Sequence, residues 1–257
     1  MAIQTDTQRS SGTASKRLAF VYGSISYLIF LGTVLYAIGF IGNLVAPKSI
    51  DSGAPIPVFQ AVLVDALLLG LFAVQHSVMA RSAFKTWWAR IIPPPIERST
   101  YVLLASLLLL LLFWQWQPLP GVVWNVDQPI GHAVLLGLYG IGWVFVIYCT
   151  FLISHFDLFG LQQVYYHLKE KQPPPVTFQA HGLYKLVRHP LMVAFLIAFW
   201  VTPRMTFGHL LFALGASGYI CLGVLLEERD LVRTFGESYT SYQQRVFMLF
   251  PWPRRKP

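Results

Sequence analysis

Residues 131–154 read GHAVLLGLYGIGWVFVIYCTFLIS, a run of 24 residues that contains no Asp, Glu, Lys or Arg. A helix that crosses the roughly 30 Å hydrocarbon core of a bilayer needs about 20 predominantly apolar residues. Further apolar stretches lie at 18–45, 58–80, 99–117, 190–202 and 208–226. Because most of these are long enough to span, the sequence predicts an all-α, polytopic membrane helix bundle of five to six transmembrane helices.

The composition of the whole chain agrees with a lipid environment. Hydrophobic residues make up 55% of the sequence and charged residues only 12%, whereas a soluble domain is about one quarter charged. The net charge is +8, but the basic residues form short clusters between apolar runs. They do not alternate with aromatic residues as a base-stacking surface requires. We therefore expect the lipid bilayer as a partner and no nucleic acid, and oligomeric state is left open.

The distribution of Lys and Arg predicts how the chain is oriented. Lysines and arginines are enriched in the cytoplasmic loops of membrane proteins. If the spans alternate, 17 of the 19 basic residues fall on one side, and only Lys48 and Arg204 fall on the other. This predicts an integral inner (plasma) membrane protein with both termini in the cytoplasm. The 17 residues are Arg9, Lys16, Arg17, Arg81, Lys85, Arg90, Arg98, Lys169, Lys171, Lys185, Arg188, Arg229, Arg233, Arg245, Arg254, Arg255 and Lys256.

Three regions are expected along the chain. Residues 1–15 are polar and are predicted to be disordered. Residues 16–154 form a four-helix transmembrane region, and residues 155–257 form a cytoplasmic-facing region. The latter contains a helical hairpin, split at Pro203 and Arg204, whose first leg is short. It ends in a cytoplasmic C-terminal helix, which we expect to continue the last apolar run from Glu227 to Val246.

Two separated motifs carry the strongest functional signal. They are HGLYKLVRHPLMVAF at 181–195 and EERDLVRTFGESYTSYQQRVFMLFP at 227–251. Together they resemble the isoprenylcysteine carboxyl methyltransferase superfamily, whose pattern is G-x-Y-x-x-x-R-H-P-x-Y-x-G followed by E-E-x-x-L and F-G-x-x-Y-x-x-Y. Met192 and Ala194 depart from the Tyr and Gly of that pattern. The matching residues are Gly182, Tyr184, Arg188, His189, Pro190, Glu227, Glu228, Leu231, Phe235, Gly236, Tyr239 and Tyr242.

This resemblance implies that S-adenosylmethionine is the cofactor. An acidic residue at a helix end can pair with its amino group, and Arg188 can pair with its carboxylate or with a glutamate of the tail. A second interpretation is an interfacial ion pair between Arg188 and Glu228 that holds the tail to the hairpin. The residues expected to bind the cofactor are His181, Gly182, Tyr184, Arg188, His189, Pro190, Glu227 and Glu228.

The first half of the chain indicates which branch of the superfamily the sequence resembles. Residues 70–102 read GLFAVQHSVMARSAFKTWWARIIPPPIERSTYV, which is similar to the NnrU-like branch of the superfamily and, more closely, to methanethiol S-methyltransferases. This implies an enzyme, a thiol S-methyltransferase that acts on a small thiol on the cytoplasmic side. The products would be dimethyl sulfide and S-adenosylhomocysteine.

Other functions remain open at this stage. One is a membrane methyltransferase that acts on a lipid or on a prenyl thiol or carboxylate. Another is a haem-binding NnrU-type isomerase, for which His76 and His189 could be axial ligands. A third is a non-catalytic membrane scaffold. Apart from the haem alternative, no metal site is assigned.

Methylation of a thiol requires a group that removes its proton, because the thiolate is the nucleophile. Asp65 and His76 are eleven residues apart, which places them on one helix face about 16 Å apart along the axis. His155 and Asp157 form a second candidate set if a helix ends near them and lets the carboxylate orient the imidazole. Each also has a structural interpretation: a hydrogen bond to a neighbouring helix for Asp65, a helix-end contact for His76, and solvation for His155 and Asp157.

Overall fold

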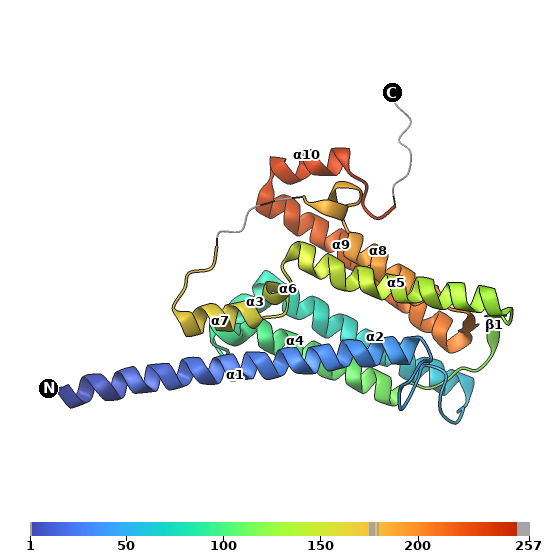
Figure 1. Cartoon of the computed structure of the whole chain (residues 1–257), viewed down its shortest axis with the longest axis horizontal. Helices are drawn as coiled ribbons and strands as arrows, with labels where there is room; N and C mark the ends of the chain where they lie inside the picture. The colour runs from blue at the N-terminus through green and yellow to red at the C-terminus, as the bar shows by residue number, and fades with distance from the viewer. Residues whose placement is uncertain (1, 175–177, 179, 251–257) are drawn as a thin grey trace. The chain divides into compact units, whose positions relative to one another are not determined.

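The computed structural model describes residues 2–174, 178 and 180–250 (Figure 1). Arg254, Arg255 and Lys256 of the basic tail lie outside the described residues. Among the described residues, five helices are long and apolar enough to cross a membrane, which confirms the all-α polytopic bundle. In chain order the elements are α1 (Ala2–Ile41), α2 (Val58–Ala80), α3 (Ser82–Trp88), α4 (Pro94–Gln115), β1 (Val122–Asn125), α5 (Pro129–Ile153), α6 (His155–Leu158), α7 (Leu161–Lys169), the 3₁₀ turn η1 (Gly182–Lys185), α8 (Pro190–Trp200), β2 (Arg204–Thr206), α9 (Phe207–Phe235) and α10 (Glu237–Arg245).

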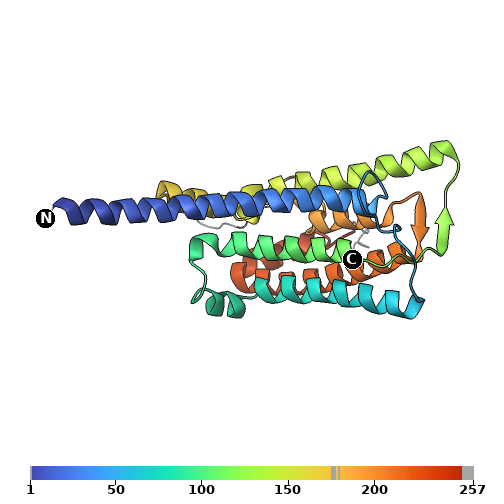
Figure 2. The ribbon, with the colours of Figure 1, turned by 90° about the horizontal axis from the view of Figure 1, so that it is seen from below.

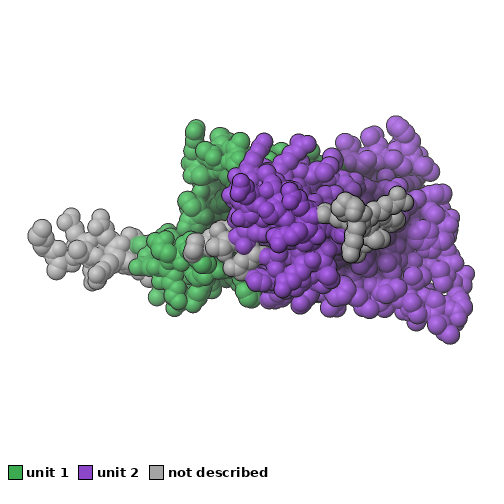
Figure 3. Space-filling view, turned by 90° about the horizontal axis from the view of Figure 1, so that it is seen from above, with its two compact units in different colours: residues 1–37, 70–114, 154–175 green, residues 38–69, 115–153, 176–257 purple. Residues whose placement is uncertain are grey.

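The chain forms two compact units, which Figure 3 colours separately. Unit 1 comprises residues 1–37, 70–114 and 154–175, and unit 2 comprises residues 38–69, 115–153 and 176–257. Helices α1 and α2 each contribute one part to each unit, so a unit is not a continuous segment of sequence. The three regions expected from the sequence remain a prediction.

Unit 1 is built on α1 and α4, which lie side by side. The Tyr22 hydroxyl is 3.0 Å from Thr100 Oγ1, and farther along both helices Tyr36 stacks on Phe113 with ring centroids 5.6 Å apart. Gly160 packs against Ser99 with φ at +86°, and a Cβ there would come within 2.6 Å of the Ser99 backbone nitrogen. Only glycine fits both the backbone angle and the space, so α7 can begin directly beside α4.

Unit 2 is built on α5, α8 and α9. Gly142 of α5 lies against α8 so closely that a Cβ would be 3.0 Å from the backbone nitrogen of Ala198. Beside it, the Trp143 ring meets Phe195 edge to face at 6.2 Å. Helix α8 has 11 residues, or roughly 16 Å at 1.5 Å per residue, which is shorter than a bilayer core. It is therefore the short leg of the hairpin that the split at Pro203 predicts.

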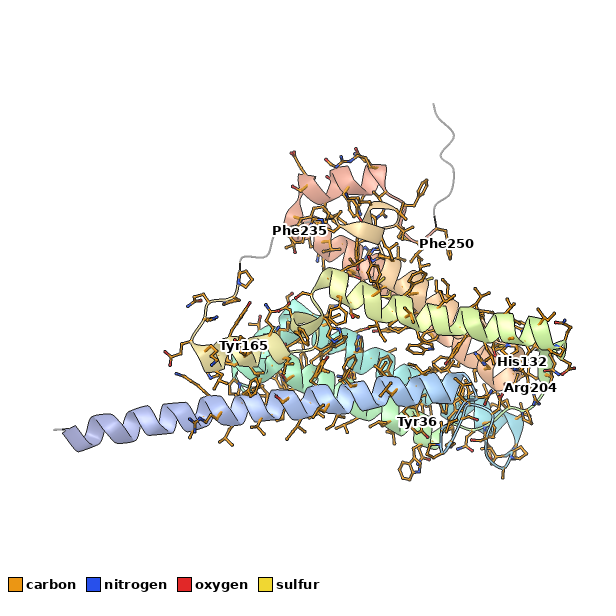
Figure 4. The ribbon with its side chains drawn as sticks, viewed as in Figure 1. Tyr36, His132, Tyr165, Arg204, Phe235 and Phe250 are labelled. Atoms are coloured by element: carbon orange, nitrogen blue, oxygen red, sulfur yellow. The ribbon has the colours of Figure 1, made fainter. Side chains whose placement is uncertain are left out.

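The two ends of unit 2 differ in the loops and strands that they carry. β1 and β2 pair antiparallel and lie at one end of α5 and α9 (Figure 2). The Thr206 hydroxyl donates to Asp51 at 2.5 Å, which brings the loop between α1 and α2 to this same end. In Figure 4, His132 and Arg204 lie at this end and Phe235 at the other. We call the end near Phe235, where the 227–251 motif begins, the motif end.

The tail differs from its expected form. Helix α9 continues to Phe235, but Gly236 adopts φ +56°, and α10 begins at Glu237 as a separate helix. The prediction of one continuous helix from Glu227 to Val246 is therefore wrong. A positive φ is accessible to glycine at little cost, and it ends a helix because it redirects the chain. The resulting turn brings α10 back against α9, and this contact assembles the site described next.

Candidate active site

Glu228 is the centre of a hydrogen-bond cluster at the motif end of unit 2. Its side chain is only 10% exposed. Oε1 accepts from Arg188 Nε at 2.8 Å and from the Tyr239 hydroxyl at 2.7 Å, and it lies 2.8 Å from His189 Nε2. Oε2 accepts from Arg188 Nη2 at 2.9 Å and from the Gln243 side-chain amide. The two chain segments that carry the motifs are thus joined at one carboxylate.

Arg188 also binds the end of α10 directly. Its Nη1 donates to the carbonyl oxygens of Gln243 at 3.1 Å and Val246 at 2.6 Å. The backbones pair as well, because Arg188 N donates to Phe247 O at 2.7 Å and His189 N to Met248 O at 3.1 Å. The arrangement of Arg188 and Glu228 is that of the ion pair holding the tail, the second interpretation considered from the sequence.

Glu227 is the other carboxylate of this cluster, and its surroundings differ. Its side chain is 50% exposed, and its Oε2 lies 3.6 Å from Nδ1 of the buried His189. His189 therefore has one carboxylate beside each ring nitrogen. Pro190 follows as the first residue of α8, where the missing N–H costs no helical hydrogen bond. Its fixed φ helps to start the helix directly after His189.

The loop before Arg188 provides the apolar and aromatic part of the site. Gly182 has φ +53°, and a Cβ there would touch Leu152 at 3.4 Å. Tyr184 is half-buried, and burial, with smaller contributions from Cys149, Glu227 and Tyr242, raises the pKa of its phenol. The Tyr242 hydroxyl donates to the Tyr184 carbonyl. His181, which precedes this turn, is exposed.

The structure therefore brings Arg188, His189, Glu227 and Glu228 together, with Tyr184 nearby. Gln243 also takes part, although it belongs to neither the matched motif positions nor the expected cofactor-binding residues. Tyr239 was matched to the family pattern but was given no role there. Both are on α10, four residues apart and so on one helix face, and that spacing is the signal that identifies them. The backbone carbonyl of Val246 carries no comparable sequence signal.

His76 is in unit 1, near the end of α2. Its Nε2 lies 2.9 Å from the Tyr101 hydroxyl, and its ring stacks on Phe72 with centroids 5.2 Å apart. Tyr101 is in turn covered by Arg98, whose guanidinium carbon is 5.2 Å from the tyrosine ring centre. The imidazole is thus held in one orientation by an aromatic face and a hydroxyl.

His155 and Asp157 are also in unit 1, after α5 ends. His155 is buried and its Nε2 lies 2.7 Å from the Tyr27 hydroxyl. Asp157 is exposed, and its Oδ1 accepts from the Gln163 amide at 3.1 Å. The imidazole and the carboxylate thus have separate hydrogen-bond partners on α1 and α7.

The buried His155 predicts a dependence of stability on pH. Burial lowers its pKa below the usual 6.5, so the unfolded chain binds the proton more readily than the folded one. The stability that the neutral ring provides is therefore present above about pH 6.5 and is lost as the pH falls below it. We expect the midpoint temperature of thermal unfolding in detergent to fall as the pH is lowered from about 7 to about 5. It should fall less for His155→Gln, and equal falls would contradict the assignment.

Asp65 lies in unit 2 at the end that carries β1 and β2. It is fully buried, and its Oδ1 accepts from Gln117 N at 2.8 Å. Nearby, Lys48 Nζ donates to the Trp116 carbonyl at 2.8 Å. Burial lowers the pKa of Lys48, and the charge of Asp65 opposes that shift. Asp65 and Lys48 together fasten α2 and its preceding loop to the segment that follows α4.

Comparisons with known proteins bear on what such a chain does. No family model matches the chain, and no solved structure matches it. Methanethiol S-methyltransferase of Mycobacterium tuberculosis is 55% identical over 238 residues, which cover 93% of this chain and 98% of the relative. The protein of that name in Crocosphaera subtropica is 48% identical over 254 residues, which cover 99% of this chain and 100% of the relative.

A more distant similarity extends to nurim of Sus scrofa. It is 34% identical over 184 residues, which cover 67% of this chain and 70% of the relative. The matches to the bacterial enzymes cover nearly all of both chains at about half identity, so they reach both units and both motifs. The chain belongs to the methanethiol S-methyltransferase family.

Proposed function

We propose that this protein transfers a methyl group from S-adenosylmethionine to methanethiol, giving dimethyl sulfide and S-adenosylhomocysteine. The observation that carries the proposal is 55% identity, across 93% of the chain, to an enzyme named for that reaction. A methyltransferase requires a methyl donor, and the cluster around His189 supports this donor in particular.

The residues at the motif end of unit 2 fit S-adenosylmethionine by their chemistry. The donor has a cationic sulfonium, an ammonium and carboxylate on its amino acid head, and an aromatic base. Glu227 provides a half-exposed carboxylate, and Tyr184 provides an aromatic ring. Gly182, with its positive φ and no side chain, lets the backbone approach a ligand closely. We propose that His181, Gly182, Tyr184, His189, Pro190 and Glu227 line the donor site, which Arg188 and Glu228 hold in shape.

When bound, the donor supplies an electrophilic methyl carbon next to a positive sulfur. The protein's own tasks are to orient the thiol in line with that carbon and to hold its proton. Orientation alone can contribute most of the rate enhancement for such a transfer. For the proton we propose His76, because Tyr101 fixes its ring by a 2.9 Å hydrogen bond. His155 and Asp157 remain alternatives for this role.

Asp65 has a different proposed role. It lies at the end of unit 2 that carries β1 and β2, whereas Glu227 is 20 residues into α9 from that end. At 1.5 Å per residue, those residues correspond to roughly 30 Å. We therefore propose that Asp65 is a structural anchor and takes no part in the proton transfer.

We propose that the donor site faces the cytoplasm and that the protein resides in the plasma membrane. Lys48 and Arg204, the two basic residues expected outside, both belong to the end of unit 2 opposite the motif end. Arg188, Arg229, Arg233 and Arg245 belong to the motif end. This distribution is that of a protein with its positive end inside, and S-adenosylmethionine is a cytoplasmic metabolite.

Headspace gas chromatography tests the proposed reaction. Purified protein in detergent, supplied with S-adenosylmethionine and methanethiol, is expected to release dimethyl sulfide at a rate proportional to protein concentration. Omitting either substrate should abolish the signal. Donor binding without dimethyl sulfide release would exclude methanethiol as the acceptor and leave a methyltransferase with another acceptor.

A further inference from the structure

We infer that the two adjacent glutamates have separate tasks: Glu228 fastens α10 to the core of unit 2, and Glu227 binds the ammonium group of the methyl donor. The inference rests on the proposed function, because it assigns part of the same site. It divides a pair that the sequence motif presents as equivalent. The role of Glu228 follows from the hydrogen bonds that its side chain makes, and the role of Glu227 follows from its exposure and its position beside His189.

Glu228 has no capacity left for a ligand. An ionised carboxylate offers about four lone-pair positions to donors. Five side-chain nitrogen or oxygen atoms already surround Glu228, from Arg188 (two), His189, Tyr239 and Gln243. An ammonium group would have to displace one of these partners, and the displaced group would lose a charge-assisted bond in a buried place. Glu228 therefore has a structural role, in which it anchors α10 to the core of unit 2.

Most of the N–H donors of Arg188 are also occupied, which argues against Arg188 as the main partner of the donor's carboxylate. A guanidinium has five N–H donors. Four of them are used: two on Glu228 and two on the carbonyl oxygens of Gln243 and Val246. These partners lie on α9 and at the end of α10. Arg188 and Glu228 therefore neutralise each other and join the segment before α8 to both.

Glu227 has the properties that Glu228 lacks. Half of its side chain is exposed, and its closest described ion-pair partner is His189 Nδ1 at 3.6 Å, beyond hydrogen-bond distance. Arg188 forms its ion pair with Glu228, so Glu227 is a second carboxylate, beside His189, that this ion pair does not include. Burial and, to a smaller extent, Cys149 and the charge of Glu227 raise the pKa of Tyr184, a residue of the turn that begins at Gly182, which supports a common site for Glu227 and Tyr184. A cation bound there would be held by charge as well as by hydrogen bonds.

Binding of two ligands to two variants tests this division. The ligands are S-adenosylhomocysteine, which has the same ammonium group, and its deamino analogue, which lacks only that group. The variants are Glu227→Gln and Glu228→Gln, and affinity is measured by calorimetry in detergent. Loss of one hydrogen bond between charged groups costs about 1.5–3 kcal/mol, or about ten- to hundredfold in affinity. We expect Glu227→Gln to lower the affinity for S-adenosylhomocysteine by that factor and to leave the affinity for the deamino analogue almost unchanged.

Glu228→Gln is the matched control, because it removes the same charge one residue away. It should lower the thermal unfolding midpoint and weaken both ligands by a similar factor, whereas Glu227→Gln should unfold at the wild-type temperature. If Glu227→Gln weakens the binding of both ligands equally, or if Glu228→Gln weakens the binding of only one of them, the assignment of the two glutamates is wrong. Neither result would contradict the proposed function. Wild-type protein that binds neither ligand would overturn the proposed function and this assignment with it.

Discussion

Arg188→Ala is expected to lower the free energy of unfolding by about 3–5 kcal/mol, because removing one partner of a buried ion pair leaves the other charge uncompensated. Glu228, with a side chain only 10% exposed, would keep its charge without its bidentate partner. The carbonyl oxygens of Gln243 and Val246 would lose their donors as well. Since these groups hold the end of α10, the helix should detach before the rest of the protein unfolds.

Hydrogen–deuterium exchange and thermal unfolding measure the two parts of this expectation. Amides of residues 237–248 should exchange faster in Arg188→Ala, while those of α5 should change little. Arg233→Ala is the control: its side chain is 81% exposed, and its nearest ion-pair oxygen, on Asp230, is 3.7 Å away. Such a surface pair contributes about 0–1 kcal/mol. If the two variants lose the same stability, Arg188 does not have the fastening role.

Adding Glu228→Gln to Arg188→Ala should recover part of the lost stability, since the buried charge is then removed as well. Each single change leaves one charge without its partner, so the two effects should not add. Additive losses would indicate that the two residues stabilise the fold through different partners. Arg188→Lys is expected to be little more stable than Arg188→Ala, because an ammonium cannot donate two parallel hydrogen bonds to one carboxylate.

The sequence predicted the membrane helices well and their connections poorly. Runs such as residues 131–154 follow from the energetics of the bilayer, which depend on composition and length and not on tertiary contacts. The end of α9 was missed because residues 227–246 contain good helix formers on both sides of Gly236. One glycine at φ +56° decides that break, and a helix tolerates an isolated glycine at a cost of only about 1 kcal/mol.

The candidate site was predictable as a set of residues but not as a set of contacts. The motifs named Arg188, His189, Glu227 and Glu228, and these do lie together. Which glutamate pairs with Arg188 depends on the turn at Gly236, because that turn brings Tyr239 and Gln243 onto Glu228. Helix periodicity likewise places Asp65 and His76 on one face, but their different neighbours, a backbone amide and a tyrosine hydroxyl, come from other segments.

His76→Ala is expected to reduce turnover of methanethiol by about 10²–10⁴-fold, the usual contribution of a general base. The affinity for S-adenosylhomocysteine should stay near that of the wild type. Turnover is measured as dimethyl sulfide release at saturating donor, and affinity by calorimetry on the same preparations. Tyr101→Phe removes the hydroxyl that lies 2.9 Å from His76 Nε2 and keeps the ring. It should cause a smaller loss of turnover, since the base remains but is held less firmly.

The pH profile separates a base from a residue that only supports the fold. Alkyl thiols are less acidic than cysteine, whose pKa is about 8.5, so little thiolate exists at neutral pH without help. Raising the pH supplies thiolate directly and makes a base unnecessary. The defect of His76→Ala should therefore shrink as the pH rises toward the pKa of methanethiol. A defect of constant size across that range would mean that His76 affects packing and not the proton. If His76→Ala turned over methanethiol at the wild-type rate, His76 would not be the base. His155, whose ring is held by Tyr27 in a similar way, would then be the candidate.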